Sequence, residues 1–169
     1  MKKILVIGSG GAGKTTFAAQ LGQMLGIEVI HLDSLYWKSG WVEMPKPEWK
    51  TLVEQLVGRE SWVMDGNYSG TIDVRFQACD TVIFLDLPRL VCLWRVFKRF
   101  LKYRNVNRPD MPVGCEEKLS LEFVLWIWNY PNETRPKIVK MLGERPQGRQ
   151  LIRLRSRAEI KTFLENVKR

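Results

Sequence analysis

The sequence has few of the residues that build disulfide frameworks or zinc sites. It contains three cysteines, Cys79, Cys92 and Cys115, and one histidine, His31. No two cysteines form a C-x-x-C pair, so the four closely spaced Cys and His ligands of a structural zinc site are missing. An odd number of widely spaced cysteines also argues against a disulfide framework and favours a reducing compartment.

Long apolar runs are missing as well. A membrane-spanning helix needs about 20 consecutive apolar residues, and the apolar stretch from Phe123 to Trp128 is far shorter. Lys2 and Lys3 precede an apolar run, as in a signal peptide, but the run Ile4–Ile7 is too short for a hydrophobic signal core. We therefore expect no membrane segment and a cytoplasmic location.

The sequence also shows no internal repeat, low-complexity tract or linker that would separate two domains. At 169 residues it has the length of one domain, and we expect a single domain over 1–169. Its 27 Lys and Arg against 18 Asp and Glu give a net charge of +9. Such a charge favours anionic partners, which include nucleotides, nucleic acid and acidic membranes, without choosing among them.

Short apolar runs alternate with amphipathic stretches, a pattern typical of a parallel sheet covered by helices. We predict strands over 3–7, 28–32, 62–64, 81–85 and 150–154, and helices over 14–25, 47–57, 88–103, 117–128, 133–142 and 158–167. Residues 104–115, rich in Asn, Pro, Gly and Arg, are predicted as a mobile loop. The sequence therefore predicts an α/β fold with a five-stranded, mainly parallel sheet.

The strongest motif follows the first predicted strand. Residues 8–15 have the sequence GSGGAGKT, which matches G-x-x-x-x-G-K-[ST], the P-loop. Glycines let the backbone wrap around phosphates with its N–H groups pointing inward, and the following helix adds the positive end of its dipole. Lys14 would place its charge on the β- and γ-phosphates of ATP, and Thr15 would offer a hydroxyl to Mg²⁺. The predicted nucleotide-binding residues of this loop are Gly8, Ser9, Gly10, Gly11, Ala12, Gly13, Lys14, Thr15 and Thr16.

A P-loop also needs an acid at the end of a neighbouring strand, where it helps to hold Mg²⁺. Asp65 follows Trp62–Met64, and Asp86 follows Val82–Leu85. We favour Asp65 as the metal residue because the third strand of small P-loop kinases lies next to the first. Each acid also has a structural alternative to metal binding. Asp65 begins an Asp-Gly-Asn sequence, which forms turns well, and Asp86 can simply end a strand before a helix.

Missing motifs narrow the class of P-loop protein. The N-K-x-D and D-x-x-G motifs of GTPases are absent, and the chain is too short for an ABC ATPase or a helicase. The residues from Asp65 to Tyr68 stand where adenylate kinases carry D-G-F-P-R. The stretch 84–88 is followed by Arg95 and Arg99. It is similar to the segment of adenylate kinases in which a strand and a proline precede a helix with two arginines four residues apart.

Taken whole, the sequence resembles the adenylate-kinase-like proteins called DNA topology modulation proteins. The matching segments are 8–15, 31–37, 65–68, 108–110 and 135–137, which together span nearly the whole chain. The resemblance implies a nucleoside- or nucleotide-kinase-like fold with a small helical lid over about 100–137, and it implies ATP and Mg²⁺ as cofactors. It leaves the phosphate acceptor open.

Asp33 is the candidate residue on the acceptor side. It follows the second predicted strand and should point toward the crevice at the carboxyl ends of the strands. A carboxylate there could take the proton of an acceptor hydroxyl, or it could cap a turn or helix. The segment 31–37 is similar to the H-x-D-x-[FY]-[YF] segment of uridine and nucleoside kinases, where an Asp meets the sugar hydroxyl. His31 is more typical of a structural histidine than of a catalyst.

Two arginines with which adenylate kinases hold an acceptor phosphate are missing from this sequence. Tyr36 and Trp37 stand where one of these arginines is expected, and Tyr68 stands near the place of the other. Arg75 could replace one of the two missing arginines. The sequence therefore favours a hydroxyl acceptor over a phosphate acceptor. Tyr36, Trp37 and Trp41 form an aromatic cluster, which could stack on a ring of the acceptor or could belong to the core.

Further arginines complete the candidate site. In kinases of the resembled class, arginines placed like Arg95 and Arg99 flank ATP, one on the base and one on the phosphates. Arg104 and Arg108 lie on the predicted lid, and Arg135 is another candidate closing residue. A solvated basic face is the alternative for each of them. The predicted catalytic residues are thus Lys14, Asp33, Arg95, Arg99 and Arg135, with Arg95 also binding ATP and with Thr15 and Asp65 at the metal.

These observations predict an ATP- and Mg²⁺-dependent kinase that acts on a small molecule, with a hydroxyl or a nucleotide as acceptor. Two other functions stay open. One is a regulatory, nucleic-acid-binding ATPase that affects DNA topology, which the basic charge supports although no nucleic-acid-binding motif is evident. The other is a nucleotide-binding protein without catalytic activity.

Overall fold

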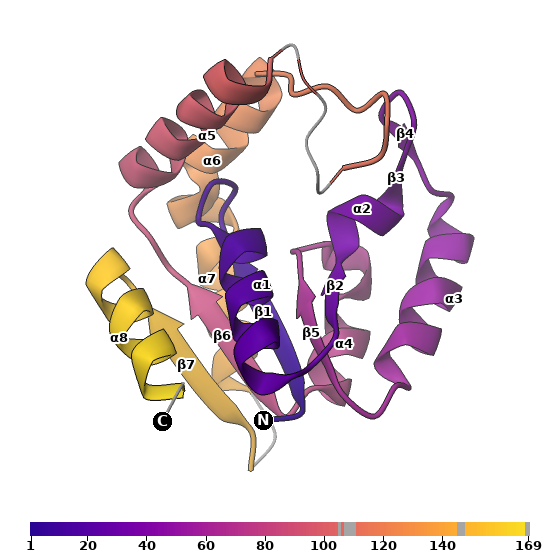
Figure 1. Ribbon diagram of the computed structural model, residues 1–169, viewed down its shortest axis with the longest axis vertical. Coiled ribbons are helices and arrows are strands. Elements are labelled where there is room, and N and C mark those ends of the chain that lie inside the picture. Colours follow the sequence, from indigo (N-terminus) through magenta and orange to yellow (C-terminus); the bar gives the residue numbers. More distant parts are fainter. Residues whose placement is uncertain (105, 107–110, 145–147, 168–169) are drawn as a thin grey trace.

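A five-stranded parallel sheet forms the centre of the protein (Figure 1). The computed structural model describes all residues except 105, 107–110, 145–147 and 168–169. The strands, in the spatial order β2-β5-β1-β6-β7, are β1 (Lys3–Gly8), β2 (Val29–His31), β5 (Trp62–Asp65), β6 (Thr81–Leu85) and β7 (Gln150–Leu154). Each neighbouring pair is parallel. The predicted α/β fold with a five-stranded sheet is confirmed.

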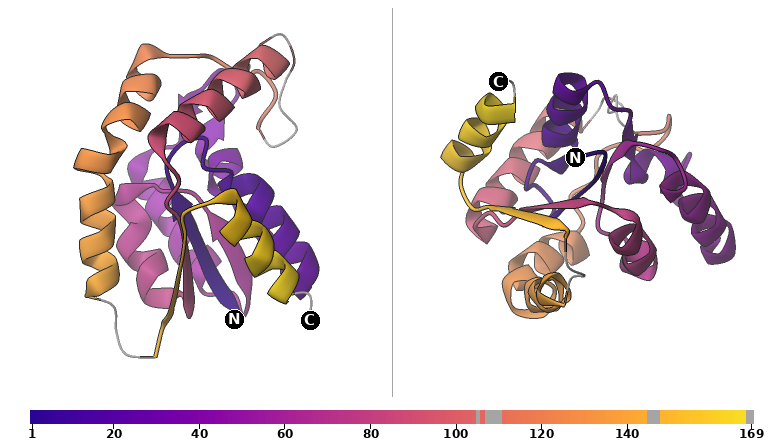
Figure 2. Two further views of the ribbon diagram at one scale, coloured as in Figure 1. Left: turned by 90° about the vertical axis from the view of Figure 1, so that its left-hand side faces the viewer. Right: turned by 90° about the horizontal axis from the view of Figure 1, so that it is seen from below.

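Helices cover both faces of this sheet (Figure 2). One face packs against α1 (Lys14–Leu25), α5 (Arg89–Tyr103) and α8 (Arg157–Val167), and the other against α3 (Lys46–Val57), α4 (Ile72–Ala78) and α7 (Arg135–Gly143). The helix α6 (Leu121–Glu133) contributes to both cores through Ile127 and Tyr130. The smaller elements are α2 (Leu32–Tyr36), β3 (Trp37–Lys38), β4 (Val42–Glu43) and the 3-10 turn η1 (Ser69–Thr71). In the part of the chain that the structure describes, no helix is both long and apolar enough to cross a membrane.

The central strand shows why the sheet forms. The side chains of Ile4, Leu5, Val6 and Ile7 are fully buried, because helices cover both faces of a parallel sheet. Leu5 and Ile7 face one core, and Ile4 and Val6 face the other. Burying each such side chain stabilises the fold by about 1.5–3 kcal/mol. The continuous apolar run near the N-terminus is therefore a central strand of the core.

The structure corrects several predicted boundaries. The helix expected from residue 117 begins at Leu121, because Ser120 caps it by accepting a hydrogen bond of 3.1 Å from the Phe123 N–H. Glu117 lies before that helix and is buried. The helices α2 and α4 and the hairpin β3–β4 were not predicted, because each is too short to show a clear hydrophobic period.

The loop after β5 is organised by a buried arginine. The Arg75 side chain is fully buried and donates hydrogen bonds to the carbonyl oxygens of Gly66, Asn67, Tyr68 and Thr71. Burial lowers the pKa of Arg75 to about 10. The expectation that Arg75 could replace a missing phosphate-binding arginine is wrong, since its guanidinium is enclosed and bonded to backbone carbonyls.

We expect Arg75→Lys to lower the free energy of unfolding by about 3 kcal/mol, because an ammonium cannot reproduce the planar set of donors and leaves buried carbonyls without partners. Urea denaturation followed by circular dichroism measures the change. The control is Arg59→Lys. Arg59 is exposed and pairs with Glu28 on the surface, so this substitution should change the free energy of unfolding by no more than about 0.5 kcal/mol. Equal losses in the two variants would contradict the organising role of Arg75.

Candidate active site

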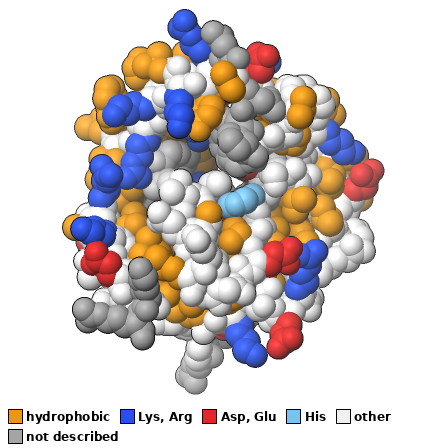
Figure 3. Space-filling model, in the orientation of Figure 1, with side chains coloured by type: hydrophobic (Ala, Val, Ile, Leu, Met, Phe, Trp, Pro, Cys, Tyr) orange, Lys and Arg blue, Asp and Glu red, His pale blue; other side chains and the backbone are white. Residues whose placement is uncertain are grey.

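A cleft of about 2020 Å³ opens around the P-loop, at the carboxyl ends of the strands. The P-loop and the start of α1 line it on one side, α5 and α6 on another, and the segments 31–41 and 66–68 on a third. Figure 3 shows Lys and Arg side chains gathered over the α5 side of the face that is in view. The cleft lies at the place where the sequence predicts the site, beyond the carboxyl ends of the strands.

The P-loop follows β1 and wraps toward α1 with two glycines in the left-handed region. Gly11 has φ 74° and Gly13 has φ 93°, a conformation that side chains rarely adopt. A Cβ atom on Gly11 would also lie 2.3 Å from the Cys92 carbonyl oxygen, and one on Gly10 would lie 2.6 Å from the Phe123 ring. The glycines therefore shape the loop and also let α5 and α6 approach it closely.

Lys14 lies inside this loop. Its Nζ atom donates hydrogen bonds of 3.1 Å to the carbonyl oxygens of Gly8 and Ser9. Burial lowers the pKa of Lys14, and the carboxylates of Asp33 and Asp65 act in the opposite direction. Both acids are thus close enough to influence the charge of the P-loop lysine.

Asn67 fixes the first residue of the P-loop. Its side-chain amide donates a hydrogen bond of 2.8 Å to the Gly8 carbonyl oxygen and accepts one of 3.2 Å from the Gly8 N–H. Because the Asn67 carbonyl oxygen accepts from Arg75, the buried arginine sets the position of this amide. The Asp-Gly-Asn sequence marks the place, but the contact of Asn67 with Gly8 leaves no signal in the sequence.

Tyr68 connects the same loop to Asp33. Its hydroxyl donates a hydrogen bond of 2.7 Å to Asp33 Oδ1, and its ring packs against Tyr36 and Trp49, at centroid distances of 4.7 and 5.0 Å. Tyr68 has φ 34°, an uncommon value for a residue other than glycine. Burial, followed by the Asp33 carboxylate, raises the pKa of Tyr68, so the hydroxyl stays a donor that orients Asp33.

Two tryptophans form an aromatic wall of the cleft. The rings of Trp37 and Trp41 meet edge to face at 5.3 Å, and both line the cleft. Trp41 has φ 63°, and its Nε1 donates a hydrogen bond of 2.9 Å to the Glu116 carbonyl oxygen. The structure thus places these aromatic rings at the surface of the cleft, where they can contact a ligand.

Asp65 lies at the end of β5, which pairs with β1 as expected for the metal-binding acid. Asp65 is buried, and its Oδ1 accepts a hydrogen bond of 2.7 Å from His31 Nδ1. His31 itself lines the cleft. The contact gives His31 a structural partner and places a buried carboxylate behind the P-loop.

Arg95 and Arg99 extend from one face of α5 into the cleft. Arg95 donates a hydrogen bond of 2.9 Å to the carbonyl oxygen of Ala12 in the P-loop, and Arg99 forms an ion pair of 2.7 Å with the buried Glu117. The structure therefore brings both arginines together with Lys14. Arg104 is exposed at the end of α5, and Arg108 lies outside the described residues.

The segment 111–120 connects the helical side of the cleft to the hairpin β3–β4. The Gly114 carbonyl oxygen accepts a hydrogen bond from the Gly40 N–H, and Cys115 Sγ donates to the Lys38 carbonyl oxygen. Met111, at one end of this segment, lines the cleft. The predicted lid region thus contributes to the wall of the cleft, and its closure stays a prediction.

Arg135 lies apart from the cleft. It donates to both carboxylate oxygens of Asp86, at 2.9 and 3.2 Å, and Arg153 donates to the same carboxylate. Burial acts to raise the pKa of Asp86, but hydrogen bonds from Arg135 and Arg153 outweigh it and hold that pKa below its ordinary value. The structure does not bring Arg135 together with the other predicted catalytic residues.

Solved structures share this architecture. The shikimate kinase from Acinetobacter baumannii, in complex with shikimate, aligns with 99% of this chain and 90% of its own, with a TM-score of 0.60 and 17% identity. The shikimate kinase from Bacteroides thetaiotaomicron aligns over 98% and 95%, with a TM-score of 0.56 and 16% identity. A sugar kinase from Janibacter sp. HTCC2649 aligns with 99% of this chain and 90% of its own, with a TM-score of 0.52 and 17% identity. The fold is that of the P-loop kinases. No family profile and no curated protein sequence matches the chain.

The pairing of Asp86 predicts a pH dependence of stability. A carboxyl whose pKa is lower in the folded state stabilises the fold above its unfolded pKa of 3.8, and the stabilisation is lost as the pH falls below that value. We expect Asp86→Asn to lower the free energy of unfolding by about 2 kcal/mol at pH 7, and the difference from the wild type to shrink below pH 3.8. Urea denaturation between pH 7 and pH 3 measures it; a difference that does not change with pH would contradict the ion-pair network.

Proposed function

We propose that the protein is an ATP- and Mg²⁺-dependent kinase that phosphorylates a hydroxyl group of a small molecule. The observation that carries the proposal is the convergence of Lys14, Asp33, Arg95 and Arg99 on one cleft around a P-loop. The likeness of the fold to shikimate and sugar kinases supports it. The sequence motifs shared with adenylate-kinase-like DNA topology modulation proteins support membership in that group as part of the same proposal.

The P-loop side of the cleft would hold the phosphates of ATP. Backbone N–H groups of residues 8–15 and the positive end of the α1 dipole favour negative charge at this place. Lys14 would release the Gly8 and Ser9 carbonyls and bind phosphate oxygens in their place. Arg95 and Arg99 approach from α5 and would stabilise the charge that develops on the transferred phosphoryl group.

Thr15 and Asp65 would hold Mg²⁺. Their hydroxyl and carboxylate oxygens are the donor type that Mg²⁺ takes in proteins, and Thr15 lies in the cleft next to Lys14. Among the described residues, His, Cys, Asp and Glu side chains form no group of three or more that would hold a metal by themselves. This fits Mg²⁺ that reaches its full coordination through phosphate oxygens and water. The ion would neutralise charge on the β- and γ-phosphates.

Asp33 would act as the general base. An acceptor hydroxyl would give its proton to Asp33 while its oxygen bonds to the γ-phosphorus and the bond from that phosphorus to the β-γ bridging oxygen breaks, so that ADP leaves. The Tyr68 hydroxyl, held on Asp33 Oδ1, would orient the carboxylate and leave Oδ2 for the acceptor.

The acceptor side of the cleft favours a ring that carries a hydroxyl. The segments 31–41 and 66–68 contribute His31, Asp33, Trp37, Trp41, Gly66, Asn67 and Tyr68 to the lining. Within these described segments, no Lys or Arg side chain lines the cleft, so a grip for an acceptor phosphate is missing there. Tryptophan rings pack well against the flat or apolar face of a ring.

Transfer to an acceptor is tested by phosphorus NMR. The protein receives ATP, Mg²⁺ and pooled nucleosides, nucleoside monophosphates, sugars and cofactor precursors. We expect a new phosphate ester signal, whose rate of appearance falls at least about 100-fold in Lys14→Ala because a positive charge on the transferred group is lost. Its chemical shift separates a hydroxyl acceptor from a phosphate acceptor.

Other outcomes of that experiment contradict the proposal. ATP that is bound and stays intact would favour the non-catalytic nucleotide-binding protein. ATP that is hydrolysed independently of any acceptor would favour the regulatory nucleic-acid-binding ATPase. Retention on DNA that falls steeply with salt concentration would then support that function.

The role of Asp33 gives a second prediction. With the acceptor found above, Asp33→Asn should reduce kcat by about 100-fold or more, because general base catalysis is lost, while the affinity for ADP stays unchanged. Steady-state kinetics and calorimetric titration with ADP measure the two quantities. Asp73→Asn, which changes an exposed acid on α4, is the matched control. A variant at Asp33 that keeps the wild-type kcat would refute the assignment of the base.

A further inference from the structure

A second pocket lies at the edge of the sheet, where β6 leads into α5. Its volume is about 480 Å³. Its described lining residues come from the link between β6 and α5, from α6 and α7, and from the end of β7: Asp86, Leu87, Pro88, Arg89, Pro131, Arg135, Arg153 and Arg155. None of these residues also lines the P-loop cleft. The two cavities are therefore separate, and the residues proposed for phosphate transfer play no part in the second one.

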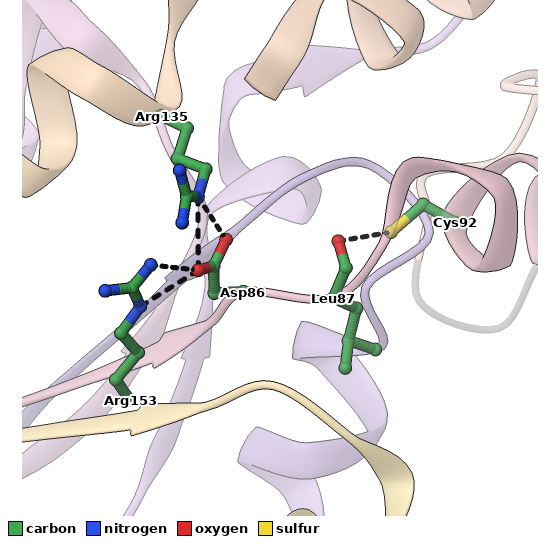
Figure 4. A network of polar contacts seen from close by, with 5 residues as sticks. All are labelled: Asp86, Leu87, Cys92, Arg135 and Arg153. Carbon is green, nitrogen blue, oxygen red and sulfur yellow. Dashed lines mark hydrogen bonds and ion pairs between the residues drawn. The ribbon is translucent and has the colours of Figure 1, made fainter. Parts of the chain in front are cut away.

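The charges in this pocket are unbalanced. Four arginines line it, and among the described lining residues Asp86 is the one carboxylate. Figure 4 shows that carboxylate between Arg135 and Arg153, which approach it from α7 and β7. A single carboxylate cannot neutralise two guanidinium groups, and Arg89 and Arg155 add two further positive charges. The excess of positive charge raises the energy of the pocket unless an anion shares it.

Arg89 is held in place for such an anion. Its Nη1 atom donates a hydrogen bond of 3.2 Å to the Trp128 carbonyl oxygen, and its guanidinium carbon lies 3.9 Å from the centre of the Trp128 ring. A guanidinium stacked on an aromatic face keeps its orientation and retains N–H groups for a further partner. Binding a ligand then costs little ordering of this side chain.

Arg155 is an exposed residue of the pocket lining. It follows β7 directly and is exposed, and its backbone N–H donates a hydrogen bond of 2.8 Å to the Glu159 carboxylate at the start of α8. That contact fixes the backbone of Arg155, which lines the pocket. Arg89 and Arg155 thus approach the pocket from two elements that are far apart in the sequence.

We propose that this pocket binds the phosphate group of a small phosphorylated compound, independently of the P-loop cleft. A phosphate carries two negative charges and several oxygens, which match the forked donors of several arginines better than a single carboxylate does. The volume falls within the range of small-molecule sites, so the pocket can hold a phosphate together with a small organic group.

Calorimetric titration with inorganic pyrophosphate, at low ionic strength and without metal, tests the proposal. We expect two sites in the wild-type protein, because the P-loop also attracts this probe. Lys14→Ala should weaken one site and leave the other unchanged. Arg89→Gln combined with Arg155→Gln should weaken the other site by about 100-fold, about tenfold for each arginine, and leave the P-loop site unchanged.

Control variants remove the same charge elsewhere. Lys50→Gln combined with Lys140→Gln changes two exposed lysines that each pair with a glutamate four residues further along the chain, and both pyrophosphate sites should remain. Arg155→Gln alone changes an exposed side chain without loosening Trp128 and should weaken the pocket site about tenfold.

Three results would overturn the proposal. They are a single site in the wild type that Lys14→Ala removes, a second site that the arginine variants leave intact, and equal weakening by the lysine control. Because the probe is not a kinase substrate, these results are independent of whether phosphate transfer is found.

Discussion

The hydrogen bonds of one buried guanidinium determine the geometry of the candidate active site. Arg75 reaches from α4 under the loop that follows β5 and holds the carbonyls of three successive residues, Gly66, Asn67 and Tyr68. A backbone held in this way presents the Asn67 amide to Gly8, at the start of the P-loop, and the Tyr68 hydroxyl to Asp33. The phosphate side and the acceptor side of the cleft therefore depend on the same support. The unusual backbone angle of Tyr68 persists because these contacts determine it from several directions.

The sequence predicts the elements that depend on local pattern and long-range burial. Strands 81–85 and 150–154 and the helix 14–25 were predicted with the observed bounds, since continuous apolar runs mark buried parallel strands and a P-loop must open a helix. The position of Asp65 beside the first strand was also correct. The short helices α2 (5 residues) and α4 (7 residues) escaped prediction because each is too short to show a clear hydrophobic period.

The roles of charged residues were harder to predict, because a sequence does not show which acid meets which base. Arg95 and Arg99 lie four residues apart on one helix face, and both line one cleft, as that spacing predicts. No comparable spacing in the sequence indicates the partner of Arg135. Its partner is Asp86, 49 residues earlier in the chain, and the pairing follows from the packing of α7 against one face of the sheet. Of the residues assigned to the sequence motifs, those near the P-loop came together, and this distant arginine did not.

The contacts between the P-loop glycines and the helices above them set the depth of the cleft. The backbone of Gly11 lies against the Cys92 carbonyl on α5, and that of Gly10 lies against the Phe123 ring on α6. The absence of a side chain at Gly11 thus allows the helix that carries Arg95 to lie close to the loop, and the absence of one at Gly10 does the same for α6. Gly10 and Gly11 therefore determine how closely α5 and α6 approach the P-loop, in addition to shaping the loop for phosphate. A larger residue at Gly11 would push α5 and its two arginines away from the loop, and the defect would resemble the loss of the arginines themselves.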